Sequence, residues 1–110
     1  MMLFFNGVST TGTAAPNIQV STDNGSTWSA SMVLATSISA SGSYNGAVSM
    51  FGLRSGYMTG FVDPLATGAL PHSTNSPRTI AVNAGARINA VRVITTDAFD
   101  LGSITPLTRG

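Results

Sequence analysis

Residues 17–28 read Asn17-Ile-Gln-Val-Ser-Thr-Asp-Asn-Gly-Ser-Thr-Trp28, and this stretch decides the fold class. Its first half alternates polar and apolar residues, so that Ile18 and Val20 share one face of an extended strand. Asn24 and Gly25 follow, and these residue types most readily adopt the positive φ angles of a tight hairpin turn. A strand that runs directly into such a turn predicts antiparallel β-structure.

Further strand signals recur at short intervals on both sides of this hairpin. β-branched and apolar residues gather between Gly-, Ser-, Asn- and Pro-rich segments, which predicts strands over residues 3–8, 17–22, 31–38, 47–53, 57–62, 78–83, 87–95 and 102–108. Pro106 predicts an edge position for the last strand, and residues 63–77 predict a long loop. We therefore expect a single all-β domain over residues 1–110, an antiparallel, jelly-roll-like β-sandwich of seven to eight short strands.

The charge content excludes several classes of function. Charged residues make up 8% of the 110 residues, against about 25% in an ordinary soluble domain, and lysine, glutamate and cysteine are absent. A net charge of +1 does not favour nucleic acid as a partner, and no apolar run approaches the roughly 18 residues that a membrane span needs. A surface so poor in charge predicts that partner subunits cover much of it.

Residues 21–28 match the pattern S-x-D-x-G-x-T-W at every fixed position, and they resemble the Asp box, a hairpin signature repeated in sialidases and other propeller proteins. The fixed positions are Ser21, Asp23, Gly25, Thr27 and Trp28. The Asp23 carboxylate can accept backbone N–H groups across the turn, while Thr27 and Trp28 pack the returning strand. One box does not make a propeller, which needs several repeats, so we interpret the motif as a structural hairpin.

Catalytic and metal-binding residues are not indicated. Glycoside hydrolysis commonly needs a pair of carboxylates, and the chain has four aspartates, of which Asp23 serves the turn. His72 is the only histidine and no G-x-S-x-G elbow accompanies it. Asp97 and Asp100 could share a calcium ion, but turn capping fits their spacing better. We expect no enzyme activity, no catalytic residue, no metal and no cofactor.

The aromatic residues raise the question of a ligand surface. Phe51, Tyr57, Phe61 and Trp28 are the large side chains that a small sandwich needs in its core. Tyr44 differs, because Gly42, Ser43 and Gly46 flank it in a turn-like context. We therefore take Tyr44 as the candidate residue of an exposed ligand surface.

Residues 87–95 provide the candidate subunit interface. Apolar residues occupy both faces of this predicted strand, whereas a two-layer sandwich has one interior. Ile88, Ala90, Arg92 and Ile94 share one side, and Arg92 could bridge to an acid of a second subunit. The alternative is that residues 63–77 cover this side within one subunit.

Two segments together resemble a known family. The first is residues 17–28, and the second consists of Ala86-Arg-Ile-Asn-Ala-Val-Arg-Val-Ile94 followed by Phe99-Asp-Leu-Gly-Ser-Ile-Thr105. Together they are similar to the small β-sandwich domains of tailed-bacteriophage virion proteins. Those domains carry an early S-x-D-G-G-x-T-W hairpin and end in I-N-x-I-R-x…G-x-F-x-x-G-T-I-T-L-Y-G. The chain departs from this pattern at Ser103 and at Pro106-Leu107-Thr108.

The resemblance implies a non-enzymatic structural protein of the virion, assembled in the host cytoplasm: a capsid decoration (cement) subunit or a tail or fibre component. Its partners would be copies of itself, a trimer above all, and the major capsid or tail protein, held by subunit–subunit contacts. The alternative function is a glycan-binding module for host attachment that uses Tyr44 and residues 63–77.

Overall fold

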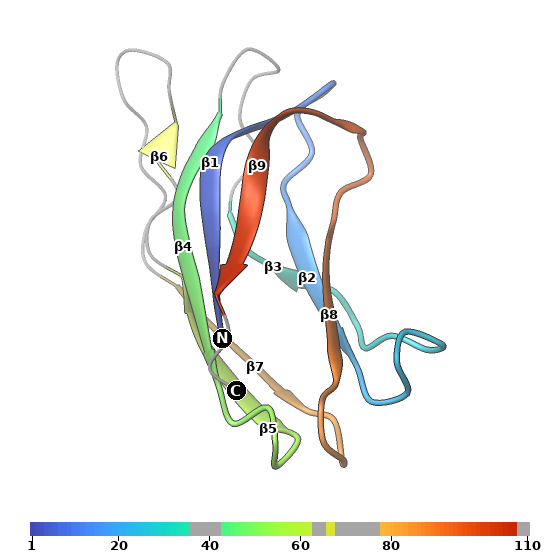
Figure 1. Ribbon diagram of the computed structural model, residues 1–110. Coiled ribbons are helices and arrows are strands. Elements are labelled where there is room, and N and C mark those ends of the chain that lie inside the picture. Colours follow the sequence, from blue (N-terminus) through green and yellow to red (C-terminus); the bar gives the residue numbers. More distant parts are fainter. Residues whose placement is uncertain (36–42, 63–65, 68–77, 108–110) are drawn as a thin grey trace.

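The computed structural model describes residues 1–35, 43–62, 66–67 and 78–107 (Figure 1). All regular structure in these residues is β-strand, and they contain no helix that could cross a membrane. The strands are β1 (Met2–Thr10), β2 (Asn17–Ser21), β3 (Met32–Val33), β4 (Tyr44–Phe51), β5 (Tyr57–Val62), β6 (Ala66–Thr67), β7 (Arg78–Asn83), β8 (Ala90–Ile94) and β9 (Phe99–Leu107).

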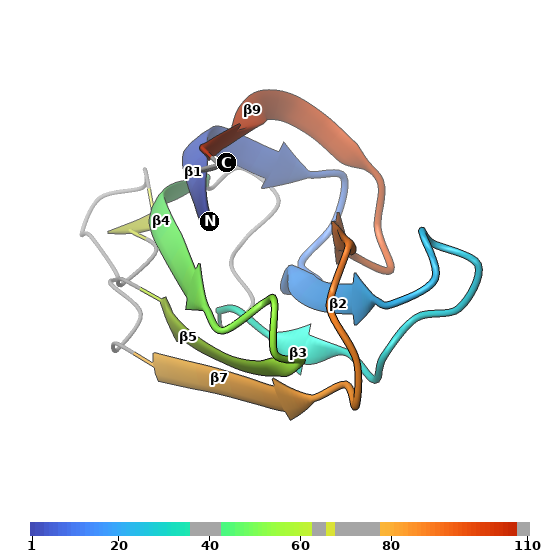
Figure 2. The ribbon, with the colours of Figure 1, turned by 60° about the horizontal axis from the view of Figure 1, so that its bottom comes forward.

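The strands form two antiparallel sheets. The larger sheet has the order β7-β5-β4-β1-β9, with β6 beside β4, and the smaller sheet has the order β3-β2-β8. Figure 2 shows the larger sheet curving around the smaller one, so that the inner faces of both sheets enclose a common interior. The predicted all-β antiparallel sandwich is confirmed. β9 lies at an edge of the larger sheet, as Pro106 predicts.

Most predicted strands are present, with shifted ends. β5 and β7 have the predicted bounds, whereas β3 is described only at Met32–Val33 and β8 begins at Ala90. The late start of β8 has a physical reason. The backbone N–H of Ile88 donates to the Leu53 carbonyl at 2.8 Å, so Ile88 bonds to the turn between β4 and β5 instead of extending the strand along β2.

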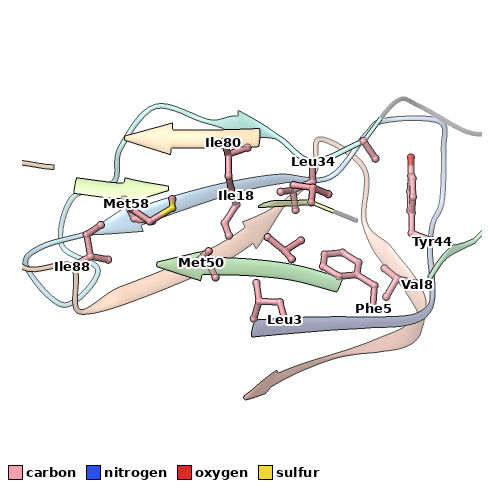
Figure 3. Packing of buried hydrophobic residues seen from close by; sticks show 14 residues of the cluster. Leu3, Phe5, Val8, Ile18, Leu34, Tyr44, Met50, Met58, Ile80 and Ile88 are labelled. Atoms are coloured by element: carbon pink, nitrogen blue, oxygen red, sulfur yellow. The ribbon is translucent and has the colours of Figure 1, made fainter. Parts of the chain in front are cut away.

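The core lies between the sheets and draws on both of them (Figure 3). β1 and β2 contribute alternate residues, Leu3 and Phe5 from the first and Ile18 and Val20 from the second. Burying each such side chain stabilises the fold by about 1.5–3 kcal/mol. The remaining fully buried large side chains are Val8, Leu34, Tyr44, Val48, Met50, Met58 and Pro16.

Tyr44 corrects a prediction. Its relative exposure is 1%, and Figure 3 places its ring at one end of the core, close to Val8, with which it pairs across β1 and β4. A residue this deeply buried cannot form an exposed ligand surface. Gly46, one of the flanking residues that suggested a turn, lies within β4 and adopts a φ of 145°.

Candidate functional site

Three aromatic side chains lie exposed on the outer face of the larger sheet. The relative exposure is 59% for Phe51, 69% for Tyr57 and 51% for Phe61. The Phe51 and Phe61 rings pack edge to face, with their centroids 6.1 Å apart and their planes at 64°. We call this group the aromatic cluster. Its members were expected in the core, and the structure shows the reverse.

Strand alternation explains why these rings point outward. Along β5, exposed and buried residues alternate without interruption, with Met58 and Val62 facing the interior. Gly60 lies between them, and a Cβ there would come within 2.5 Å of the Cγ1 atom of Ile80, so the inner side is already filled. Tyr57 and Phe61 therefore have only the outer face to occupy.

The strand register extends this face across the whole sheet. Residues that pair directly in antiparallel strands share a face, so Phe4 and its partners Ala47 and Thr105 lie on the same side as the aromatic cluster. Leu107, paired with Met2, lies at its far end and is 58% exposed. The described residues of the outer face, which include no charged residue, are Met2, Phe4, Asn6, Ala47, Ser49, Phe51, Tyr57, Thr59, Phe61, Thr79, Ala81, Asn83, Ser103, Thr105 and Leu107.

A face of this kind has a functional meaning. Soluble monomers rarely expose large contiguous apolar patches, and those that they do expose commonly mark contacts with other molecules. The described part of this face carries no carboxylate, imidazole or amine, and its ionisable side chain is the phenol of Tyr57.

The hairpin at residues 21–28 adopts the predicted turn. Asn24 and Gly25 have φ angles of 57° and 91°, and the Ser26 N–H donates to the Asp23 carbonyl at 3.3 Å. The Asp23 carboxylate accepts the hydroxyl of Thr27 at 2.5 Å, the hydroxyl of Ser21 at 2.7 Å and the Thr27 N–H at 2.8 Å. These bonds lower the pKa of Asp23 from 3.8 to about 2, and the bond from the Thr27 hydroxyl is the largest cause.

Trp28 lies on the outer side of the smaller sheet. It is half-buried, and the Arg92 guanidinium lies 4.2 Å from the centroid of its ring. Arg92 also donates from Nε to the Gln19 side chain at 2.8 Å. Trp28 is thus part of a surface stack across the smaller sheet, which corrects its expected place in the core.

The predicted interface residues on 87–95 divide into two groups. Ile88 is 6% exposed and belongs to the core, which corrects its predicted place on an exposed strand face. Ala90 and Ile94 are half-buried on β8, and Arg92 is held by Trp28 and Gln19 within one subunit. The segment before Ala90 is not strand, and this is why Ile88 does not follow the alternation of the other three.

Asn89 is a structural residue that the sequence analysis missed. Its side-chain oxygen accepts the Asn24 N–H at 3.0 Å, and its side-chain nitrogen donates to the Thr22 carbonyl at 3.2 Å. Its own N–H donates to the Ser21 carbonyl at 2.9 Å. Asparagine side chains readily bond to backbone groups, but Asn89 lies inside the predicted strand over residues 87–95, so the sequence did not mark it as a residue that holds the hairpin.

Asp97 and Asp100 accept hydrogen bonds from parts of the chain that are distant in sequence. Asp97 accepts the Ala14 N–H at 2.7 Å, and Asp100 accepts the hydroxyl of Ser9. The described residues contain no group of three or more side chains that could hold a metal ion. His72 and the rest of residues 68–77, the expected loop and glycan surface, lie outside the described residues.

Comparison with protein-family models, with curated proteins and with solved structures finds no match in any of the three. The comparisons therefore do not place the chain in a family, and the resemblance of its sequence to virion domains stays a prediction.

Proposed function

We propose that this chain is a non-enzymatic assembly domain that binds neighbouring subunits through the outer face of its larger sheet. The observation that carries the proposal is the aromatic cluster, where Phe51, Tyr57 and Phe61 are each more than half exposed on a face whose described residues carry no charge. Burying these rings against a second protein removes apolar area from water, the dominant favourable term in most protein association.

The edge-to-face packing of Phe51 and Phe61 favours a protein as the partner. Rings inclined at 64° leave ridges and hollows that the side chains of a protein interface can fill. A sugar-stacking platform presents ring faces instead. Glycan binding, the alternative function, also loses Tyr44, because that side chain is buried.

The setting that we propose is the particle of a tailed bacteriophage, with the chain as a capsid decoration subunit or as a tail or fibre component. Support comes from the similarity of the two sequence segments and from a chain that is 8% charged, which suits a subunit largely covered by its neighbours. The self-contact that we propose is a closed ring of copies, for which a trimer is the working model.

The test compares two variants by size-exclusion chromatography with light scattering. We expect wild type to be larger than its 11.2 kDa chain mass and the double variant Phe51→Ser/Phe61→Ser to approach that mass. Val33→Ser is the matched control, because Val33 is 47% exposed but lies on the smaller sheet; it should behave as wild type. A monomeric wild type, or equal effects of control and double variant, would contradict self-association through this face.

Two further measurements distinguish a structural virion component from a glycan-binding attachment module. Mass spectrometry of purified phage particles should detect the chain. Copy numbers on the order of hundreds per particle would indicate decoration of a symmetric shell, and a handful would indicate a tail component. Absence from particles would contradict the virion proposal. Binding on a glycan array that is lost in Tyr57→Ala would favour the attachment module instead.

A further inference from the structure

The sandwich is closed along one side and open along the other. The edge strands β3 and β7 approach each other, with Cα atoms within 8 Å across the two sheets. The opposite edge strands do not: no Cα atom of β8 lies within 8 Å of one in β9. Figure 1 shows β8 and β9 as separate ribbons, joined only by the chain at one end. Side chains of both strands, Val93 of β8 and Phe99 and Ile104 of β9 among them, line a hollow between the two sheets.

An apolar groove runs along this open side. One part of the groove has a volume of about 340 Å³ and is lined by Val91 and Val93 of β8, Leu3 of β1 and Ile104 of β9. Past Met1 and Val91 it continues into a second hollow of about 530 Å³, which reaches Leu53, Ile88 and Arg87. Both hollows are lined chiefly by side chains that pack on the core, such as Val91, Val93 and Ile104. The smaller sheet thus stops short of covering the larger sheet.

β8 is the edge that can accept another strand. Its pairing with β2 is regular from Ala90 to Ile94 and includes no proline. β9 is a poorer template, because Pro106 lacks an N–H and the register of β9 with β1 shifts at two places. An added strand would therefore extend the smaller sheet from β8.

We propose that the groove binds an extended segment of a partner protein, which adds to β8 as a new edge strand. Its backbone would pair with residues 90–94, and every second side chain, small and apolar, would enter the groove toward Leu3 and Ile104. This inference does not rest on the proposed function, because Phe51 and Phe61 lie on the outer face of the larger sheet, away from the groove.

Arg87 specifies one end of the partner segment. Its side chain is exposed, and it is the charged residue in the lining of the second hollow, the one of about 530 Å³. It has no ion pair within the described part of the chain. All described strand pairs in the molecule are antiparallel, and an antiparallel addition to β8 would bring the carboxyl end of the new strand toward Ala90 and Arg87. The segment that fits is thus an alternating apolar strand with a carboxylate at its C-terminal end.

The test uses the full chain and an acetylated nonapeptide of alternating threonine and valine with a free C-terminal carboxylate. We expect it to slow amide hydrogen exchange at residues 90–94, as measured by NMR. A peptide of the same composition with its valines contiguous should not do so. Arg87→Ala, or amidation of the peptide, should weaken binding about two- to fivefold, the range for an exposed ion pair. Arg54→Ala is the matched control, an exposed arginine outside the groove lining, and should leave binding unchanged.

Three results would overturn the proposal. The first is no protection of residues 90–94 by the alternating peptide. The second is equal protection by both peptides, which would indicate nonspecific apolar adsorption. The third is protection without peptide that rises with protein concentration, which would assign the groove to a second copy of this chain. The Phe51→Ser/Phe61→Ser variant should bind the peptide as wild type does, so failure of the assembly proposal and failure of this one remain distinguishable.

Discussion

Asn89 holds the hairpin of residues 21–28 against the start of β8, through the bond that its side-chain oxygen accepts from the Asn24 N–H at 3.0 Å. The two residues are 65 positions apart in the sequence. Arg92, three positions further along, adds a second link by stacking on Trp28. The hairpin and the start of β8 are therefore one physical unit, in which Asn89 and Arg92 fix the position of the hairpin.

Asn89→Ala should destabilise the fold by about 1 kcal/mol, the scale of hydrogen bonds that are partly replaced by water. The bonds lost are those to Asn24 and to the Thr22 carbonyl. Urea unfolding gives the free energy, and amide exchange at Asn24 should speed up specifically. Asn6→Ala is the control, because Asn6 is exposed on β1 and should change stability little. Equal effects of the two variants would show that Asn89 does not hold the hairpin.

Asp23 should make the stability of the hairpin depend on acid pH. Its pKa in the folded protein, about 2, lies below the ordinary value of 3.8, so the ionised carboxylate stabilises the fold above that ordinary value. This contribution is lost as the pH falls toward 2. Asp23→Asn should therefore lower the melting temperature near neutral pH, and its difference from wild type should shrink on acidification.

The cause of the low pKa can be tested separately by NMR titration of the Asp23 carboxyl. Thr27→Val removes the hydroxyl that donates to this carboxylate and should raise the pKa toward its ordinary value. A pKa for Asp23 that is unchanged in Thr27→Val would contradict the assignment of Thr27 as the main cause.

The sequence predicted those features of the fold that depend on interactions between residues close together in the chain. The positive φ angles of Asn24 and Gly25 follow from residue type, and the bonds from Ser21 and Thr27 to Asp23 span a few residues. Strand alternation likewise identified β5 and β7 with their bounds. Each of these features depends on neighbours in the sequence.

The site could not be predicted in the same way, because it depends on which face of each strand turns inward. Phe61 and Val62 are both apolar, and only the packing of Ile80 onto Gly60 shows that Val62 faces the core. Tyr44 sits among glycines, yet its pairing with Val8 buries it. Ile88 leaves the alternation of β8 because its backbone bonds to Leu53. These long-range contacts reverse the expected places of the aromatic residues.

Trp28→Ala should cost about 1–2 kcal/mol rather than the roughly 3–5 kcal/mol of a fully buried tryptophan, because Trp28 is half-buried. Part of this cost is the stacking of Arg92, for which a double-mutant cycle with Arg92→Ala should give a coupling of about 0.5–1 kcal/mol. Denaturant unfolding of the four proteins provides the measurement. A loss on the scale of a core residue, or a coupling near zero, would contradict the surface stack.

Tyr44 and Tyr57 provide the sharpest comparison between the core and the outer face, because one residue type occupies two opposite environments. Tyr44 is 1% exposed and Tyr57 is 69% exposed. Tyr44→Ala should destabilise the fold by about 3–5 kcal/mol, since it empties a large aromatic site. Tyr57→Ala should change stability by about 0.5 kcal/mol or less. Of the two alanine variants, only Tyr57→Ala should weaken subunit assembly, because Tyr57 lies in the aromatic cluster. Thermal melts and light scattering of both variants test this assignment, with Tyr44→Phe as a variant that preserves the packing of the ring. A stable, assembly-defective Tyr44→Ala would contradict the buried position of Tyr44.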